Sequence, residues 1–206
     1  MKKTHEIANC VVVFTLLLAH CKLLSAQKPG CGEITAMAKM ARAISPAELV
    51  ANKLKAGDSY SARVVYAARL LELDPQKRDA AVLLLNLIPK DDEQHRLLMS
   101  FGDHLCGTES FKEMKVLDQV GERIPHDLTR AVLLAPEKIP EYVAYSMASV
   151  QDPHSDYALQ MQKVCRAKHS EFVEAVAKLP LEKREQFLKY IFDLDGCNAL
   201  ALPEGE

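Results

Sequence analysis

The densest group of side chains that could do chemistry lies between Asp152 and Tyr157, in the run Asp-Pro-His-Ser-Asp-Tyr. An imidazole beside carboxylates occurs in metal sites and in general acid–base catalysis, so His154 and Asp156 are candidates for either role. The run also has a structural interpretation: Asp152 caps a helix, Pro153 takes its first position, and Asp156 interacts favourably with the helix dipole. We prefer this interpretation and assign no catalytic, cofactor-binding or metal-binding residue.

A second candidate is the triplet Gly57-Asp58-Ser59, which resembles the G-D-S that carries the nucleophile in one family of esterases. Such a motif needs its own structural context, here a preceding strand and an Asp-x-x-His near the C-terminus. Our triplet lies between two expected helices, and the Asp-x-x-His from Asp92 to His95 is in the middle of the chain. We therefore expect Gly57 to end one helix and Asp58 to cap the next.

The cysteines that follow the first 26 residues favour disulfides over a metal site. Cys31, Cys106, Cys165 and Cys197 include no C-x-x-C pair, and an even number in an exported chain is typical of structural disulfides, with three possible connectivities. If two helices fold back antiparallel at Pro180, Cys165 lies 15 residues before the turn and Cys197 lies 17 after it. We therefore predict the pairs Cys165–Cys197 and Cys31–Cys106.

Helices must position all these residues, because Ala, Leu, Glu, Lys, Gln and Met dominate, glycine occurs only 8 times, and no alternating β-branched run is present. The capping box that begins at Ser45 and the stops at Gly, Asp-Pro and Pro divide the chain into elements. We expect helices over residues 33–44, 46–57, 59–74, 79–88, 92–101, 108–120, 128–134, 140–150, 153–179 and 181–192. Short links between them favour an all-α array of antiparallel hairpins that ends in a long helix hairpin.

One stretch of this array, Ala67 to Pro75, reads Ala-Ala-Arg-Leu-Leu-Glu-Leu-Asp-Pro and resembles the end of a tetratricopeptide (TPR) helix pair. The resemblance covers one repeat end; no Trp/Gly/Tyr signature precedes it and no second copy follows at a spacing of about 34 residues. It implies a TPR-like superhelical stack and a role in binding a protein or peptide.

The first 26 residues have the form of a cleaved export signal. Lys2 and Lys3 form a basic start, Cys10–Ala19 is an apolar run, and Ala26 offers a cleavage site. The run is shorter than the roughly 18–20 apolar residues that span a bilayer, so we expect no transmembrane segment. An alternative is acylation of Cys21, because the residues that end there are similar to a bacterial lipoprotein box.

Removal of residues 1–26 changes the formal net charge from −2 to −4, since it takes away three lysines and one glutamate. An acidic chain without a basic stripe is a poor nucleic-acid binder, so we expect no such partner. We interpret residues 27–202 as one helical domain and residues 203–206 as a flexible acidic tail.

The function that these patterns favour is that of an exported helical scaffold in a bacterial cell envelope, periplasmic or secreted, which binds another protein or peptide without catalysis. Two alternatives stay open. One is an enzyme or metal-binding protein that uses His154 and Asp156. The other is a carrier of a small molecule or lipid in a cavity between helices.

Overall fold

The structure, a computed structural model, describes residues 31–51, 59–99, 111–149 and 156–185. These segments contain helices and no strands, which confirms the expected all-α class. The helices are α2 Cys31–Arg42, α3 Pro46–Ala51, α4 Tyr60–Leu73, α5 Arg78–Leu85, α6 Asp92–Met99, α7 Phe111–Leu134, η2 Pro136–Lys138, α8 Ile139–Ser149, α9 Asp156–Ala167 and α10 His169–Ala177. The predicted export signal and acidic tail lie outside the described residues.

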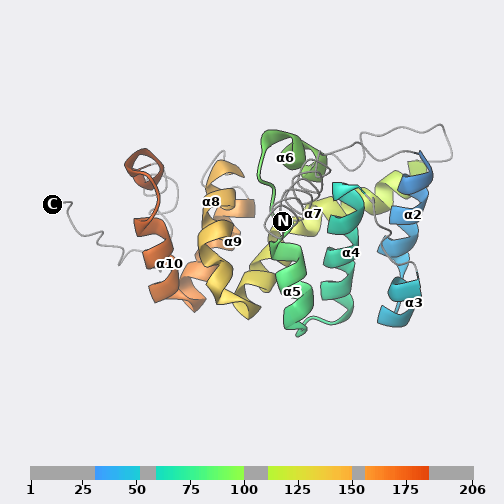
Figure 1. The fold of residues 1–206 in the computed structure, drawn as a ribbon, viewed down its shortest axis with the longest axis horizontal. Coiled ribbons are helices and arrows are strands. Elements are labelled where there is room, and N and C mark those ends of the chain that lie inside the picture. Colours follow the sequence, from blue (N-terminus) through green and yellow to red (C-terminus); the bar gives the residue numbers. More distant parts are fainter. Residues whose placement is uncertain (1–30, 52–58, 100–110, 150–155, 186–206) are drawn as a thin grey trace, which may run out of the picture.

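Most of these helices stand side by side along the long axis of the molecule, from α2 and α3 at one end to α10 at the other (Figure 1). Helices that follow each other in the chain pack together, as α4 does with α5 and α8 with α9. The longest described helix, α7, runs across the row and contacts α2, α4, α5 and α9. A row of helices is therefore tied together by one crossing helix.

The break that we predicted within residues 121–127 is wrong, because α7 continues through Pro125. A proline inside a helix costs about 3 kcal/mol, since it removes a backbone donor and crowds the preceding turn. Burial of an apolar stripe on both sides of the proline offsets this cost, at roughly 1.5–3 kcal/mol for each large side chain. The stripe consists of Leu117, Val120, Ile124, Leu128 and Ala131.

The single helix that we predicted over residues 153–179 is also wrong, because it is divided into α9 and α10 at Lys168. The backbone of Lys168 has φ −140° and ψ 54°, which is not helical. Tyr157 and Met161 before the break and Phe172 after it are all buried, so the apolar periodicity gives no sign of the interruption. The division lets both helices pack against α8.

Two predicted helix starts can be checked. The capping box at Ser45 is confirmed: its Oγ accepts from the Glu48 N–H at 3.2 Å, and the Glu48 carboxylate accepts from the Ile44 N–H at 2.9 Å. The next cap is Ser59 rather than Asp58, because the Ser59 side chain accepts from the Ala62 N–H at 3.2 Å. Ser59 therefore has a structural role in this fold.

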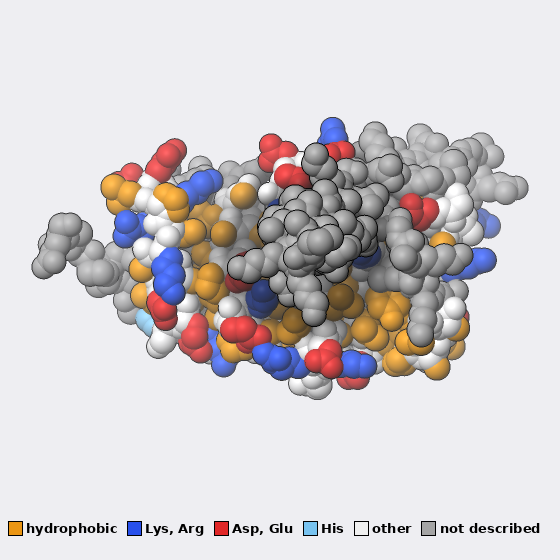
Figure 2. All heavy atoms as spheres, viewed as in Figure 1, with side chains coloured by type: hydrophobic (Ala, Val, Ile, Leu, Met, Phe, Trp, Pro, Cys, Tyr) orange, Lys and Arg blue, Asp and Glu red, His pale blue; other side chains and the backbone are white. Residues whose placement is uncertain are grey.

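The ends of the row leave apolar side chains in solvent. Ile44, beside α3, is 84% exposed, and Leu181, after α10, is 64% exposed. Figure 2 shows hydrophobic side chains gathered at the end of the molecule that α3 forms. Terminal helices of an array lack a neighbour on one side, which explains this exposure.

Candidate functional site

The structure shows no site built on the candidates His154 and Asp156 in the described part of the chain. His154 lies outside the described residues, and Asp156 is exposed at the first position of α9. Among the described residues, no group of three or more His, Cys, Asp or Glu side chains is arranged to hold a metal ion.

The side chain of one of the four cysteines, Cys165, can be described. Cys165 is fully buried on α9 and is disulfide-bonded. The positions 106 and 197 lie outside the described residues, so the pairing of Cys165 with Cys197 and of Cys31 with Cys106 stays a prediction. The arithmetic behind it assumed one helix from Cys165 to Pro180, and the break at Lys168 removes that support.

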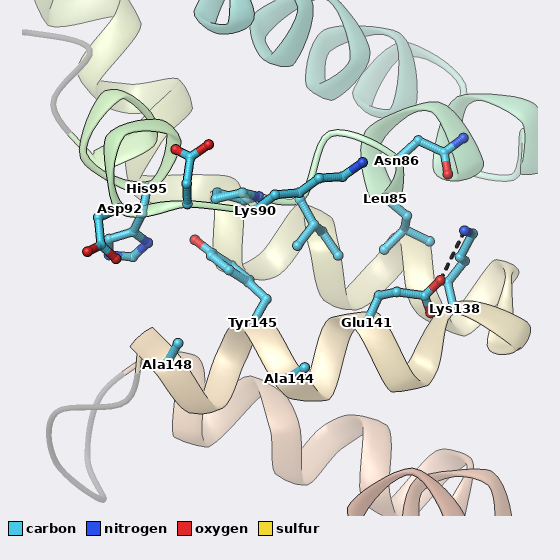
Figure 3. Close-up of a pocket in the computed structure, with 13 residues that line it drawn as sticks. Leu85, Asn86, Lys90, Asp92, His95, Lys138, Glu141, Ala144, Tyr145 and Ala148 are labelled. Atoms are coloured by element: carbon cyan, nitrogen blue, oxygen red, sulfur yellow. Dashed lines mark hydrogen bonds and ion pairs between the residues drawn. The ribbon is translucent and has the colours of Figure 1, made fainter. Parts of the chain in front are cut away.

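The structure instead contains a pocket of about 520 Å³ between the α5–α6 connection, the start of α6, and α8 (Figure 3). Its volume lies within the range of about 300–1,000 Å³ that is usual for ligand sites. One wall comes from residues 85–95 and the other from residues 138–148. The site therefore joins two segments that are far apart in the sequence.

The first wall is held in place by the cap of α6. The Gln94 N–H donates to Asp91 Oδ1 at 2.7 Å, and Gln94 Oε1 accepts from the Lys90 N–H at 3.0 Å. This reciprocal arrangement is a capping box, with Asp91 as the cap. It fixes the backbone that carries Lys90, Asp91 and Asp92, all of which line the pocket.

The second wall is one face of α8. Glu141, Ala144, Tyr145 and Ala148 lie at positions i, i+3, i+4 and i+7, which share one helix face, and they line the pocket together with Lys138. The two alanines are exposed, and their small side chains leave the space that the pocket occupies. Lys138 Nζ donates to Glu141 Oε1 at 3.2 Å, so these two charges neutralise each other at one end of the pocket.

The ring of Tyr145 supplies an aromatic surface in this wall although only 6% of the residue is exposed. Its hydroxyl oxygen lies 2.9 Å from that of Tyr157, and its ring meets the ring of His95 edge-on at a centroid distance of 5.8 Å. Nearby, the Tyr60 hydroxyl donates to the Leu87 carbonyl oxygen at 2.7 Å. These contacts hold the aromatic wall in one orientation.

Burial raises the pKa of Tyr145, Tyr157 and Tyr60 above the ordinary tyrosine value. The three phenols are therefore neutral hydroxyls at physiological pH. They can shape a surface and share hydrogen bonds, but they do not supply a phenolate base or nucleophile.

The two ends of the pocket differ in charge. Figure 3 shows Asp92 and His95 together at one end, with the hydroxyl end of Tyr145 directed toward them. Lys138 and Glu141 lie at the other end, and the Lys90 side chain extends toward Asn86. The Asp92 end is thus acidic and aromatic, whereas the other end carries a neutralised pair and one lysine.

A second group of charges lies where α4 meets α7. Arg123 binds the Glu72 carboxylate through two hydrogen bonds of 2.6 and 2.7 Å, and Arg69 contacts the same carboxylate. Arg69 Nε also donates to the Ala43 carbonyl oxygen at 2.8 Å, just beyond the end of α2. The network joins α2, α4 and α7.

The carboxylate of Asp127, close to this network, lacks a hydrogen bond to one of its oxygens in the described part of the chain. Asp127 is 5% exposed, its Oδ2 has no hydrogen-bond partner among the described residues, and its nearest described cation is Arg123 Nη2 at 3.8 Å. Burial raises the pKa of Asp127 to about 6, and the nearby Arg123 and Arg130 only partly oppose this.

The pocket was not predicted from the sequence. The Asp92 to His95 spacing was noted there only as an incomplete esterase feature. Tyr145 is buried, yet its ring lines the pocket. A usable signal was the run of charges from Lys90 to Glu93 directly after Pro89, at a helix start inside an apolar region.

Comparisons of the chain with protein-family models, with curated proteins and with solved structures found no match. In the described part of the chain, every helix is too short or too polar to cross a bilayer.

Proposed function

We propose that this protein is an exported, non-catalytic helical scaffold that binds a segment of a partner protein or peptide in the pocket between α6 and α8. The observation that carries the proposal is the pocket itself, in which apolar and aromatic surface is surrounded by charged groups. Peptide-binding sites commonly combine an apolar anchor position with polar groups at the edge that set orientation.

The lining favours a peptide over a lipid. Apolar contacts come from Leu85, Ile88, Pro89 and the two alanines of α8, while most of the other lining side chains are charged. A lipid tail would place apolar surface against these charges, which is unfavourable. A peptide can match both kinds of surface, because it offers side chains of either kind together with backbone hydrogen-bonding groups.

The alternative that rests on His154 and Asp156 has no support from a second observation. Asp156 lies on α9, and the pocket walls come from α5, α6, α8 and the connections beside them. For this reason we propose binding rather than catalysis as the activity.

We extend the proposal to the architecture and the location. The helix α4 ends at Leu73 with Asp74 as its C-cap, where the TPR resemblance implies a repeat end, and this supports a TPR-like superhelical stack. Export is supported by residues 1–26. N-terminal sequencing of material from the cell envelope tests it: a start near Gln27 is expected, and an intact Met1 in the cytoplasm would contradict it.

The binding proposal is tested by blocking the pocket. Ala144 is exposed and lines the pocket, so Ala144→Trp fills it without disturbing the core. Ala36, exposed on α2, gives the matched control Ala36→Trp. Affinity enrichment from the cell envelope followed by quantitative mass spectrometry should recover the same proteins with wild type and Ala36→Trp but not with Ala144→Trp. Equal recovery with both variants contradicts the proposal.

A further inference from the structure

We infer that the bound segment carries a lysine or arginine side chain, which the pocket receives at the end formed by Asp92, His95 and Tyr145. This inference rests on the proposed function and adds the chemistry of the partner. The charges of the two ends and the aromatic rings between them carry it.

The acidic groups at this end are available to a ligand. Asp92 is exposed, and neither Asp91 nor Asp92 forms an ion pair with a described lysine or arginine. Asp91 accepts the capping hydrogen bond from Gln94 through Oδ1 and keeps its other oxygen. A cation that enters the pocket therefore meets two carboxylates that do not already hold one within the described part of the chain.

The basic groups of the pocket do not neutralise these carboxylates. Lys138 is paired with Glu141 at the opposite end. The Lys90 side chain extends along the pocket toward Asn86, away from Asp92 and His95 (Figure 3). The pocket is therefore complementary to a segment whose positive charge faces α6.

The aromatic rings favour the same ligand group. Cations are attracted to the faces of aromatic rings, and arginine and lysine place apolar stems against neighbouring apolar surface. Tyr145 and His95 meet edge-on beside Asp92, so their faces point in different directions around one small space. Ala148 lies at the same end, where its small side chain leaves room for the stem.

A random peptide library displayed on phage tests the inference with four proteins: wild type, Ala36→Trp, Ala144→Trp and Asp92→Lys. Wild type and Ala36→Trp should enrich peptides with lysine or arginine at one fixed position, and Ala144→Trp should not. For a peptide selected on wild type, Asp92→Lys should raise the Kd roughly tenfold, because it replaces attraction by repulsion. Asp92→Asn should give a smaller change of the same sign.

The outcomes separate this inference from the function that it rests on. If wild type enriches peptides that Ala144→Trp loses, but these peptides show no preference for lysine or arginine, the pocket binds peptides and the inference is wrong. If no enriched peptide is sensitive to Ala144→Trp, both the inference and the proposed function fail. Circular dichroism of each variant shows that the helices are intact; Asp92 makes no hydrogen bond within the described structure, so its variants should fold.

Discussion

In the described part of the molecule, charged side chains gather at the contact between α4 and α7 and at the pocket between α6 and α8, and the surroundings of these groups differ. At the first place, Glu72 is held by Arg123 and Arg69, and Asp127 is buried beside them. At the second, Asp92 is exposed and bonded to no described side chain. In the first group a carboxylate is bound by cations of the fold, whereas in the second the carboxylate stays open to solvent.

This difference shows why charge alone does not identify a functional site. Both groups would be read from the sequence as polar positions on amphipathic helices. A carboxylate bound by two arginines has little attraction left for a ligand, whereas an exposed carboxylate beside a pocket keeps most of it. The following predictions test this division, from the largest expected effect to the smallest.

Loss of the arginine that joins α4 to α7 should have the largest effect on stability. Arg123→Ala removes two charge-assisted hydrogen bonds to Glu72 and the nearest described cation from Asp127. We expect the free energy of unfolding to fall by about 2–3 kcal/mol, measured by urea denaturation. The control is Arg78→Ala, which breaks an exposed pair with Glu137 and should cost less than about 1 kcal/mol. Equal losses would contradict the account.

Replacement of the buried carboxylate of Asp127 should raise the free energy of unfolding rather than lower it. Because burial raises the pKa of Asp127 to about 6 from 3.8, the group favours the folded state most below pH 3.8, and this contribution is lost as the pH rises through 6. Asp127→Asn should therefore be more stable than wild type by about 2 kcal/mol at pH 7.5. The advantage should shrink as the pH falls from 7 toward 4.5.

A range of pH 4.5–7.5 avoids most of the titration of Glu72, the other carboxylate of the network. Hydrogen bonds from Arg123 and Arg69 lower the pKa of Glu72 despite its partial burial, so its stabilising contribution is lost only at more acidic pH. Thermal unfolding of both proteins across pH 4.5–7.5 therefore reports mainly on Asp127. An advantage of Asp127→Asn that does not change with pH would show that the carboxylate is not protonated in this range.

The smallest effect on stability is expected in the pocket. Asp92→Asn removes a charge that makes no ion pair in the described structure, so the free energy of unfolding should change by less than about 0.5 kcal/mol. The comparison with Arg123→Ala under identical urea conditions is the measurement. A loss above about 1 kcal/mol would place Asp92 in the folding network rather than in a binding site.

The sequence predicted the parts of this fold that depend on local chemistry. The helical class follows from composition and apolar periodicity, and the capping box at Ser45 forms as expected. The errors at Pro125 and Lys168 arise where tertiary packing overrides local preference: a buried stripe carries α7 through a proline, and a continuous apolar period hides the end of α9. Rules that depend on neighbouring residues in the sequence do not include the packing energy that decides both cases.

The pocket was beyond sequence reasoning for a different reason. Its two walls, residues 85–95 and 138–148, are separated in the chain by residues 96–137, which include the crossing helix α7. Only the packed arrangement reveals that Asp92 and His95 on α6 share a space with Tyr145 on α8. A motif search treats these segments as unrelated.

The most direct test of the central claim is photocrosslinking in the cell, with benzoylphenylalanine placed at Glu141 on the edge of the pocket. The same substitution at Glu174, an exposed glutamate on α10 away from the pocket, is the control. We predict a covalent adduct with a partner protein from position 141 that Ala144→Trp abolishes, and none from position 174. Adducts of equal yield from both positions, or an adduct from 141 that persists in Ala144→Trp, would contradict the assignment of this pocket as the binding site.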